Sequence, residues 1–240
     1  MEKGQPRVRW QVVLVAIAAA LGAFWAFRPP ASLDLLVGEG PAGPSVPIEP
    51  FSRIWREGRV VLLGLGDSVT RGYGASVGRG YFERLHAPVD ALEPAMAGRS
   101  LRAVFPRIEA TNLAVSFTIS AGHLSQQIPS LPPHPADTFG VVVLTTGGND
   151  LLHDYGRKPP RDGAAYGAAL AQAQAWSASF RARLEALVAG IEERFPGGCA
   201  IFLATIFDPT DGVGDIERAP VRLPAWPDGL KVLELFNAVI

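Results

Sequence analysis

Hydrophobic residues are distributed unevenly along the chain: one long uncharged segment lies near its start, and several short apolar runs follow residue 59. The short runs occupy residues 60–65, 110–115, 141–144 and 199–207. Continuous apolar runs of this length are typical of parallel strands that are covered on both faces. We therefore predict four buried parallel strands.

Helical patterns separate these runs. An alanine-rich segment at about 164–195 carries apolar residues on one helical face, and a Pro-Gly-Gly sequence at 196–198 ends it. The residues on that face are Phe180, Leu184, Leu187, Val188 and Ile191. Strands that alternate with helices predict an open α/β sheet, with a ligand site at the carboxyl ends of the strands.

The long uncharged segment predicts a membrane span. Residues 1–9 carry three basic side chains and one acid, and the next 18 residues, 10–27, carry no charge. A helix of that length is about 27 Å long, close to the hydrocarbon thickness of a bilayer. We predict a cytoplasmic tail at 1–9 and a signal anchor at 10–28, because the segment ends in bulky residues that make a poor cleavage site. The alternative is a cleaved signal peptide, and either reading places the rest of the protein outside the cytoplasm.

The segment after the span has the composition of a linker. Residues 29–55 include six prolines, and such a stretch favours an extended chain with little secondary structure. The remaining residues, 56–240, are numerous enough to bury the core of one mid-sized domain.

Composition and charge exclude several classes of protein. Of the 240 residues, 48% are hydrophobic and 19% are charged, which excludes a disordered chain. The 22 basic and 23 acidic residues form no basic run in the body of the chain, so we expect no nucleic-acid partner. The single cysteine cannot form an intramolecular disulfide. No Cys/His cluster has zinc-site spacing, and the carboxylates at 208–215 do not match an EF-hand, so we predict no metal site and a substrate-side loop at 208–215.

Two polar turns directly follow predicted strands. Gly66-Asp67-Ser68 follows the first strand, where the Ser68 hydroxyl can face a cleft and head a helix. A serine in this position can equally be a simple helix cap. Gly147-Gly148-Asn149-Asp150 follows the third strand, and the Asn149 amide there can donate to a developing oxyanion. Two such turns at the ends of buried strands favour a catalytic site over two unrelated turns.

In these two motifs the sequence resembles the SGNH/GDSL hydrolase family. GDSVTRGYG resembles the first sequence block of that family and TTGGND resembles its third, and the resemblance extends from about residue 59 to the end of the chain. It implies a three-layer α/β/α sandwich with a parallel sheet of flavodoxin-like type. It also implies that Ser68 is the nucleophile and that Asn149 and the Ser68 N–H are oxyanion donors, with Asp67 and Gly148 in supporting positions.

The second block of the family matches less closely. The stretch NLAVSFTIS at 112–120 resembles the family pattern of Asn, small residues and Gly, and the position of the oxyanion glycine falls on Phe117. An alternative register places Gly122 there. We favour Phe117, because this register keeps the spacing from Asn112 and the donor is a backbone N–H that any residue carries.

The family takes its general base from an Asp-x-x-His motif after its fifth strand. The last residues here, LKVLELFNAVI, are typical of the helix before that strand, so we expect the final strand and helix to be missing from this chain. One Asp-x-x-His does occur, at Asp150 and His153, but it overlaps the third block. We interpret it as coincidental and keep His153 as the alternative base. The other histidines, His86, His123 and His134, are expected on the surface or in loops.

These observations predict an ester hydrolase outside the cytoplasm. Ser68 would attack an acyl carbonyl of a lipid or envelope carbohydrate ester, and water would release the acyl-enzyme without a metal or organic cofactor. The alternative is a non-catalytic ligand-binding domain on the same scaffold, which the residue at position 117 and the missing Asp-x-x-His motif favour. The predicted partners are a small-molecule or polymer ester and a membrane held through the N-terminal helix.

Overall fold

The computed structural model describes residues 46–87, 96–208 and 224–240, which belong to one compact unit, Val46–Ile240. The predicted tail, the predicted span at 10–28 and most of the predicted loop at 208–215 lie outside the described residues. Within the described residues no helix combines the length and the hydropathy that a membrane crossing requires.

The end of the predicted linker belongs to the folded unit. Residues Glu49–Ser52 form a short 3-10 helix, η2, and the backbone N–H of Trp55 donates to the Val104 carbonyl at 2.9 Å. The Trp55 ring also contacts Phe51 and Phe105, with ring centroids 5.5 Å apart in each pair. Residues 46–55 therefore pack on the domain, whereas the sequence placed them in the linker.

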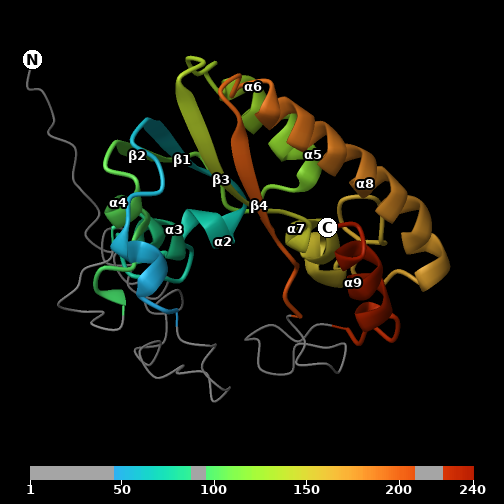
Figure 1. Ribbon diagram of the computed structural model, residues 1–240. Coiled ribbons are helices and arrows are strands. Elements are labelled where there is room, and N and C mark those ends of the chain that lie inside the picture. Colours follow the sequence, from blue (N-terminus) through green and yellow to red (C-terminus); the bar gives the residue numbers. More distant parts are fainter. Residues whose placement is uncertain (1–45, 88–95, 209–223) are drawn as a thin grey trace, which may run out of the picture. The chain divides into compact units, whose positions relative to one another are not determined.

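Four parallel strands form the sheet, in the order β2-β1-β3-β4. The strands are β1 (Arg59–Gly66), β2 (Ile108–Asn112), β3 (Thr138–Thr145) and β4 (Cys199–Ala204). All four predicted strands are confirmed. Two predicted C-terminal ends are wrong: β2 stops at Asn112 rather than at residue 115, and β4 stops at Ala204 rather than at residue 207, where the chain leaves the sheet (Figure 1).

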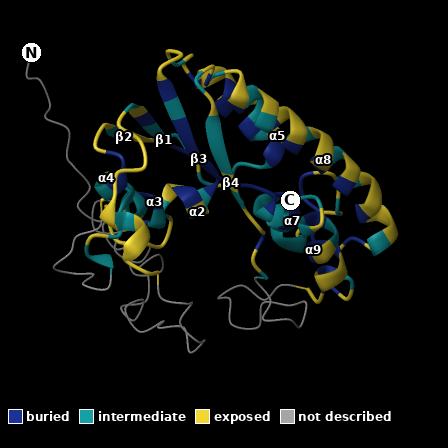
Figure 2. Cartoon of the chain, in the orientation of Figure 1, coloured by how far each residue is buried: buried dark blue, intermediate teal, exposed yellow. Residues whose placement is uncertain are grey.

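Helices cover both faces of the sheet, which confirms the three-layer α/β/α fold (Figures 1 and 2). One face packs against α3 (Tyr81–His86) and α4 (Leu101–Val104). The other packs against α6 (Ile128–Ser130) and α8 (Leu170–Glu192). Alternate residues of a strand point to opposite faces, and the two clusters divide the strands in this way. Val60, Leu62, Val141 and Val143 join the first cluster, and Leu63, Leu65, Val142 and Leu144 join the second.

The long helix is shorter than its alanine-rich sequence predicts. It begins at Leu170, not near Ala164, because Gly167 has a left-handed backbone (φ 86°) that interrupts any helix. A second helix, α9 (Gly229–Asn237), confirms the helix predicted near residue 240. It packs on α8 through Phe180 and Phe236, whose ring centroids are 5.2 Å apart.

The outer strands are less buried than the apolar runs predict. Phe202 of β4 exposes 60% of its surface, although the run at 199–207 predicts a strand covered on both faces. Phe202 pairs with Val143 and so lies on the face that α3 and α4 cover, but it is not part of the cluster that those helices form with the sheet.

The strand order also locates a crevice. From β1 the chain crosses to β2 on one side, and β3 and β4 follow on the other. Ligands of open α/β sheets bind where the order reverses in this way, outside the carboxyl ends of the strands. That point lies between the ends of β1 and β3, which are the strands followed by the two polar turns.

Candidate active site

The turn after β1 places Ser68 at the start of α2 (Ser68–Arg71). Gly66 has φ 107°, and a Cβ there would lie 1.9 Å from the Thr145 carbonyl oxygen, so only glycine fits. The next residue, Asp67, caps the helix by accepting from the Val69 N–H at 3.0 Å. Ser68 itself is half-buried and lines a cavity. The capping role that the sequence left open for Ser68 therefore belongs to Asp67.

A chain of hydroxyl groups holds this turn against β3. Thr145 donates to Asp67 Oδ1 at 2.8 Å, and the Thr70 and Tyr81 hydroxyls continue the chain at 2.8 and 2.6 Å. Asp67 is buried, and burial raises the pKa of its carboxyl above the ordinary value. The network fixes the direction in which α2 leaves the sheet, and therefore the position of Ser68.

The turn after β3 brings Asn149 to the same cavity. Gly147 has φ 94°, and a Cβ there would lie 2.6 Å from the Ile206 side chain. The helix α7 (Gly148–Leu152) follows, and both Gly148 and Asn149 line the cavity with Ser68. Asn149 Nδ2 donates to the Thr118 carbonyl at 2.8 Å, which fixes the side-chain amide. The bond also distinguishes the amide nitrogen of Asn149 from the amide oxygen, and this nitrogen, Nδ2, is the atom that could donate to an oxyanion.

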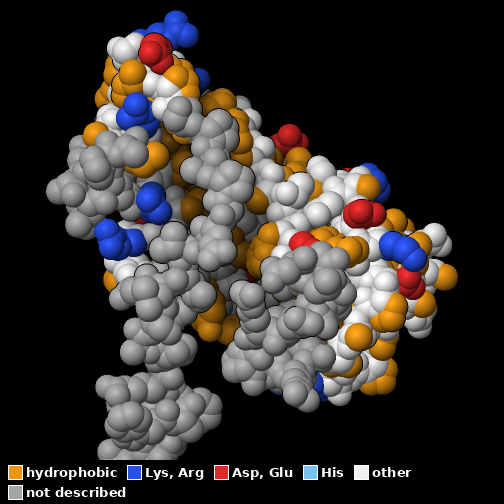
Figure 3. All heavy atoms as spheres, turned by 90° about the horizontal axis from the view of Figure 1, so that it is seen from below, with side chains coloured by type: hydrophobic (Ala, Val, Ile, Leu, Met, Phe, Trp, Pro, Cys, Tyr) orange, Lys and Arg blue, Asp and Glu red, His pale blue; other side chains and the backbone are white. Residues whose placement is uncertain are grey.

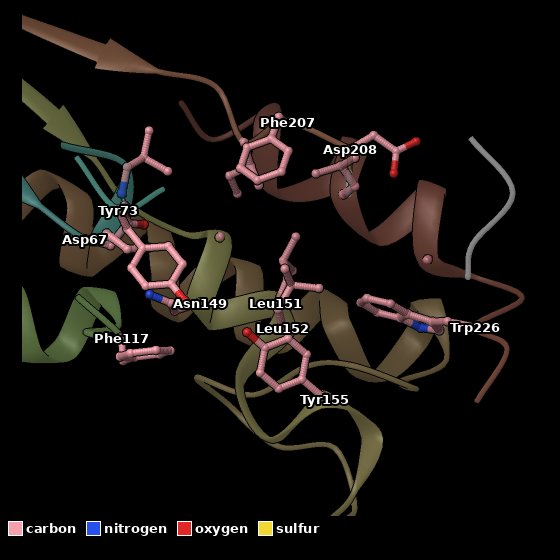
Figure 4. Close-up of a pocket in the computed structure, with 16 residues that line it drawn as sticks. Asp67, Tyr73, Phe117, Asn149, Leu151, Leu152, Tyr155, Phe207, Asp208 and Trp226 are labelled. Carbon is pink, nitrogen blue, oxygen red and sulfur yellow. Dashed lines mark hydrogen bonds between the residues drawn. The ribbon is translucent and has the colours of Figure 1, made fainter. Parts of the chain in front are cut away.

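Phe117 reaches the cavity, and Gly122 does not. Phe117 has φ 66°, a left-handed conformation that explains why the family pattern expects glycine at this position. Its ring is 60% exposed and contacts Tyr73, with centroids 6.2 Å apart (Figure 4). Gly122 ends the short helix α5 (Ser120–Gly122) and is not among the residues that line the cavity. The geometry thus brings together Ser68, Phe117 and Asn149.

One segment that the sequence did not single out connects the three turns that carry Ser68, Phe117 and Asn149. It is η4 (His123–Gln127), a π-helix, a rare form that often occurs at functional sites. The Gln127 side chain accepts from the Gly66 N–H and donates to the Gly66 carbonyl, both at 2.8 Å. His123 bonds Thr118 Oγ1 at 2.8 Å and Thr146 Oγ1 at 3.0 Å.

The prediction that His123 lies on the surface or in a loop is wrong. The side chain is buried, and burial lowers its pKa from 6.5 to about 4, so the ring is neutral at pH 7. A signal was present in the sequence: His123, Gln127 and Leu131 recur every four residues and so lie on one helical face. Leu131 marks that face as the buried one.

The Asp150–His153 pair is not assembled at the cavity. Asp150 is buried and accepts from both the backbone and the hydroxyl of Ser120, and Arg183 forms an ion pair with it at 3.5 Å. Burial raises the pKa of this carboxyl. His153 begins the short helix η5 (His153–Gly156) and does not line the cavity. No histidine is among the described residues that line it.

The cavity has a volume of about 250 Å³, and its lining is mainly apolar. It lies at the face where the strands end, and hydrophobic side chains are visible near the middle of that face (Figure 3). Figure 4 shows Asp67, Tyr73, Phe117 and Asn149 at one end and Trp226 at the other. Within residues 46–87, 96–208 and 224–240, no group of three or more His, Cys, Asp or Glu residues is arranged to hold a metal ion.

A parallel α/β/α sheet with a Gly-Asp-Ser turn and a Gly-Gly-Asn turn at adjacent strand ends defines an SGNH-type hydrolase. The chain belongs to the GDSL-like Lipase/Acylhydrolase family, whose sequence model matches residues 65–239. It is therefore a hydrolase of the esterase class.

Solved structures similar to this chain include phospholipase A1 from Streptomyces albidoflavus NA297. That protein is 18% identical, the alignment covers 77% of this chain and 74% of that chain, and the TM-score is 0.43. TesA is 19% identical over 75% of this chain and 97% of that chain, with a TM-score of 0.39. No curated protein sequence matches. The family assignment rests on the sequence match over residues 65–239.

Proposed function

We propose that the chain hydrolyses carboxylic esters through an acyl-enzyme formed on Ser68. The observation that supports this most directly is the convergence of Ser68, Phe117 and Asn149 on one cavity. The proposed oxyanion donors are the N–H groups of Ser68 and Phe117 and the Nδ2 of Asn149. Preorganised donors of this kind supply a large share of the catalysis in acyl transfer.

The reaction proceeds in two halves. Ser68 Oγ attacks the acyl carbonyl, the oxyanion donors stabilise the tetrahedral intermediate, and the alcohol leaves with a proton. Water then attacks the acyl-enzyme and releases the acid. The Ser68 proton passes to a base, and the described lining residues offer two carboxylates, Asp67 and Asp208, and no imidazole.

The substitution Ser68→Ala tests the mechanism. We expect it to abolish both hydrolysis of p-nitrophenyl butyrate and labelling by a fluorophosphonate, with the free energy of unfolding changed by less than about 0.5 kcal/mol because Asp67 provides the cap. Ser76→Ala is the matched control, since Ser76 is exposed in the next loop. Undiminished hydrolysis by the Ser68→Ala protein would refute the proposal.

Asn149→Ala tests the oxyanion donors. The nucleophile remains, so labelling by the fluorophosphonate continues, while kcat falls by about 10²–10³-fold because one preorganised donor is lost. Steady-state kinetics on p-nitrophenyl butyrate measure this effect. A kcat unchanged by this substitution would remove Asn149 from the mechanism.

The second candidate function is ligand binding without catalysis. The observation that favours it is the absence of any histidine among the described lining residues. A serine in a binding domain is unactivated and does not react with a fluorophosphonate. Failure of Ser68 to react in the otherwise folded chain, together with saturable binding of an ester, would favour this alternative.

We further propose that the enzyme works outside the cytoplasm, held by the segment 10–28, on O-acyl esters of lipids or of envelope carbohydrates. The uncharged span and its basic flank support this location. Protease added to intact spheroplasts should digest the domain. A domain that stays protected until the cells are lysed would refute this location.

A further inference from the structure

Aromatic rings that face solvent line part of the cavity. Five aromatic side chains are exposed among the described residues, and three of them, Tyr73, Phe117 and Phe207, line the cavity. These three expose 75%, 60% and 62% of their surfaces, and the other two are Trp55 and Phe202. We name the three rings at the cavity the aromatic mouth. Exposed apolar side chains that gather at one place indicate a contact surface for a ligand.

Three separate segments supply the aromatic mouth. Tyr73 follows α2, Phe117 follows β2 and Phe207 follows β4. The Tyr73 N–H donates to the Ser68 carbonyl at 2.9 Å, and the Tyr73 ring meets Phe117 edge-on with centroids 6.2 Å apart. Figure 4 shows both rings near Asn149. The aromatic mouth therefore lies next to the groups that are proposed to react.

A carboxylate accompanies the aromatic mouth. Asp208 directly follows Phe207 and also lines the cavity (Figure 4). The other acid of the lining, Asp67, is buried and caps α2 by accepting from the Val69 N–H, so we assign no ligand to it. No Lys, Arg or His is among the described residues that line the cavity. The open side of the cavity thus combines aromatic rings with negative charge and offers no positive charge.

This combination fits a cation better than an anion or a neutral group. The face of an aromatic ring is electrically negative, and it attracts a cation that lies within about 6 Å of the ring centroid. A nearby carboxylate adds to this attraction, whereas an anion in the cavity would meet negative charge and no cation. A quaternary ammonium group suits aromatic rings in particular, because its methyl groups make apolar contacts while its charge meets the ring faces.

One interaction of this kind already exists beside the cavity. The Arg157 guanidinium lies over the ring of Tyr155, 6.0 Å from its centroid. Tyr155 also lines the cavity, but we leave it out of the aromatic mouth because a cation already covers its ring. Among the described residues, no cation lies over the three rings of the aromatic mouth. Those rings are therefore open to a cation from the substrate.

We propose that the aromatic mouth and Asp208 bind a quaternary ammonium group in the alcohol part of the ester. This inference rests on the proposed ester hydrolysis and names the class of its alcohol, a choline-type alcohol. In the first half of the reaction Ser68 Oγ bonds to the acyl carbon, the bond from that carbon to the alcohol oxygen breaks, and the alcohol takes up a proton. The acyl group stays on Ser68 while the alcohol leaves into water, so we assign the cation of the alcohol to the exposed part of the cavity.

Two esters test the proposal because they differ at one atom. In 3,3-dimethylbutyl butyrate a neutral carbon replaces the charged nitrogen of butyrylcholine. The full chain is assayed in a nonionic detergent, so that no cationic headgroup competes. Each kcat/KM is divided by the rate constant of hydrolysis by hydroxide, because the charged nitrogen makes choline the better leaving group.

We expect a normalised preference of about ten-fold or more for butyrylcholine. Added salt should reduce this preference, because it screens the attraction between the cation and Asp208. Equal normalised rates on the two esters, or a preference for the neutral ester, would overturn the proposal.

Substitutions at Asp208 and Phe207 test the site itself. Asp208→Asn and Phe207→Leu should each reduce the normalised preference about three-fold or more, since one removes the charge and the other replaces the ring by an aliphatic side chain. The ratio of the two esters cancels any loss that affects both, including a loss of proton transfer. Asp137→Asn is the matched control, since Asp137 is exposed and does not line the cavity. An unchanged preference in either the Asp208→Asn or the Phe207→Leu protein would overturn the assignment.

Failure of the proposed function gives a different result. If neither ester is hydrolysed and Ser68 does not react with the fluorophosphonate, the hydrolysis proposal fails. Saturation-transfer NMR on the methyl signal of choline chloride then decides the cation site alone. Binding that Asp208→Asn weakens and Asp137→Asn does not would support the site. No binding of choline, or equal binding of the neutral 3,3-dimethylbutanol, would overturn it.

Discussion

At the scale of single residues, Phe117 is held in a backbone conformation that side chains disfavour. Its φ of 66° costs a residue with a Cβ about 1–2 kcal/mol relative to glycine. The ring recovers little of this by packing, since it is 60% exposed. The left-handed turn instead places residue 117 beside the cavity.

We predict that Phe117→Gly raises the free energy of unfolding by about 1 kcal/mol, because the relief of backbone strain exceeds the added entropy of the unfolded chain. Phe117→Ala is the matched control, since it keeps the strain and also loses the ring contact with Tyr73. Urea denaturation compares the three proteins. A Gly variant less stable than the Ala variant would contradict this account.

His123 makes stability depend on pH. The folded pKa is about 4, against 6.5 for an exposed histidine. Between these values the unfolded chain binds a proton that the folded chain does not, so the free energy of unfolding falls as the pH falls from 6.5 to 4. The full difference corresponds to about 3 kcal/mol.

We predict that His123→Gln removes this loss. Burial raises the pKa of Asp67 and Asp150, so these groups add stability as the pH falls and act in the opposite sense. The difference between wild type and His123→Gln, measured by urea denaturation at pH 7 and pH 4, isolates the histidine. An equal loss in both proteins would show that His123 is not the cause.

At the scale of residues, the sequence predicted the side chains at the strand ends but missed the buried His123. Ser68 and Asn149 could be chosen because each directly follows an apolar run, which fixes its place at the sheet edge. His123 could not be chosen by that rule, because it does not follow an apolar run. Its burial depends on how η4 packs against the turns that carry Thr118 and Thr146. Only the four-residue spacing to Gln127 and Leu131 indicated that it faces the core.

At the scale of elements, η4 (His123–Gln127) joins the turns that carry Ser68, Phe117 and Asn149. Gln127 holds Gly66, two residues before Ser68, and His123 holds Thr118, whose carbonyl accepts from Asn149. A disturbance of this one segment therefore reaches the turn that carries Ser68 and the side chain of Asn149.

We predict that Gln127→Leu lowers the free energy of unfolding by about 2–3 kcal/mol, because the buried Gly66 N–H loses its acceptor. It should also lower kcat on p-nitrophenyl butyrate. Gln126→Leu is the matched control, since Gln126 lies in the same segment and is exposed. Two variants of equal stability and activity would show that the segment does not support the site.

The sequence predicted the existence of the elements better than their limits. Apolar runs indicate strands because a strand that is covered on both faces needs apolar side chains. All four predicted strands and both predicted helices, α8 and α9, are confirmed. The limits of α8 depend on a left-handed glycine and those of β4 on where the chain leaves the sheet. Neither of these is encoded in hydrophobic periodicity.

At the scale of the whole domain, β4 is an outer strand with an apolar surface. Phe202 is 60% exposed, and the strand pairs only with β3 among the described residues. Unpaired strand edges with exposed apolar side chains promote association between chains.

We predict that Phe202→Lys slows aggregation, because a lysine at an exposed edge opposes pairing with another chain. The free energy of unfolding should change by less than about 0.5 kcal/mol, since the side chain is mainly in solvent. Light scattering at rising protein concentration measures the first effect and urea denaturation the second. Identical scattering by the two proteins would argue against association through this edge.

The lining of the cavity comes from two separate parts of the chain, and this has a consequence for how the shape of the cavity can change. Ser68 and Asn149 lie in the turns after β1 and β3, whereas Trp226 and Leu233 come from the segment before α9 and from α9 itself. A substitution at Leu233 can therefore reshape the apolar end of the cavity while the two turns stay in place.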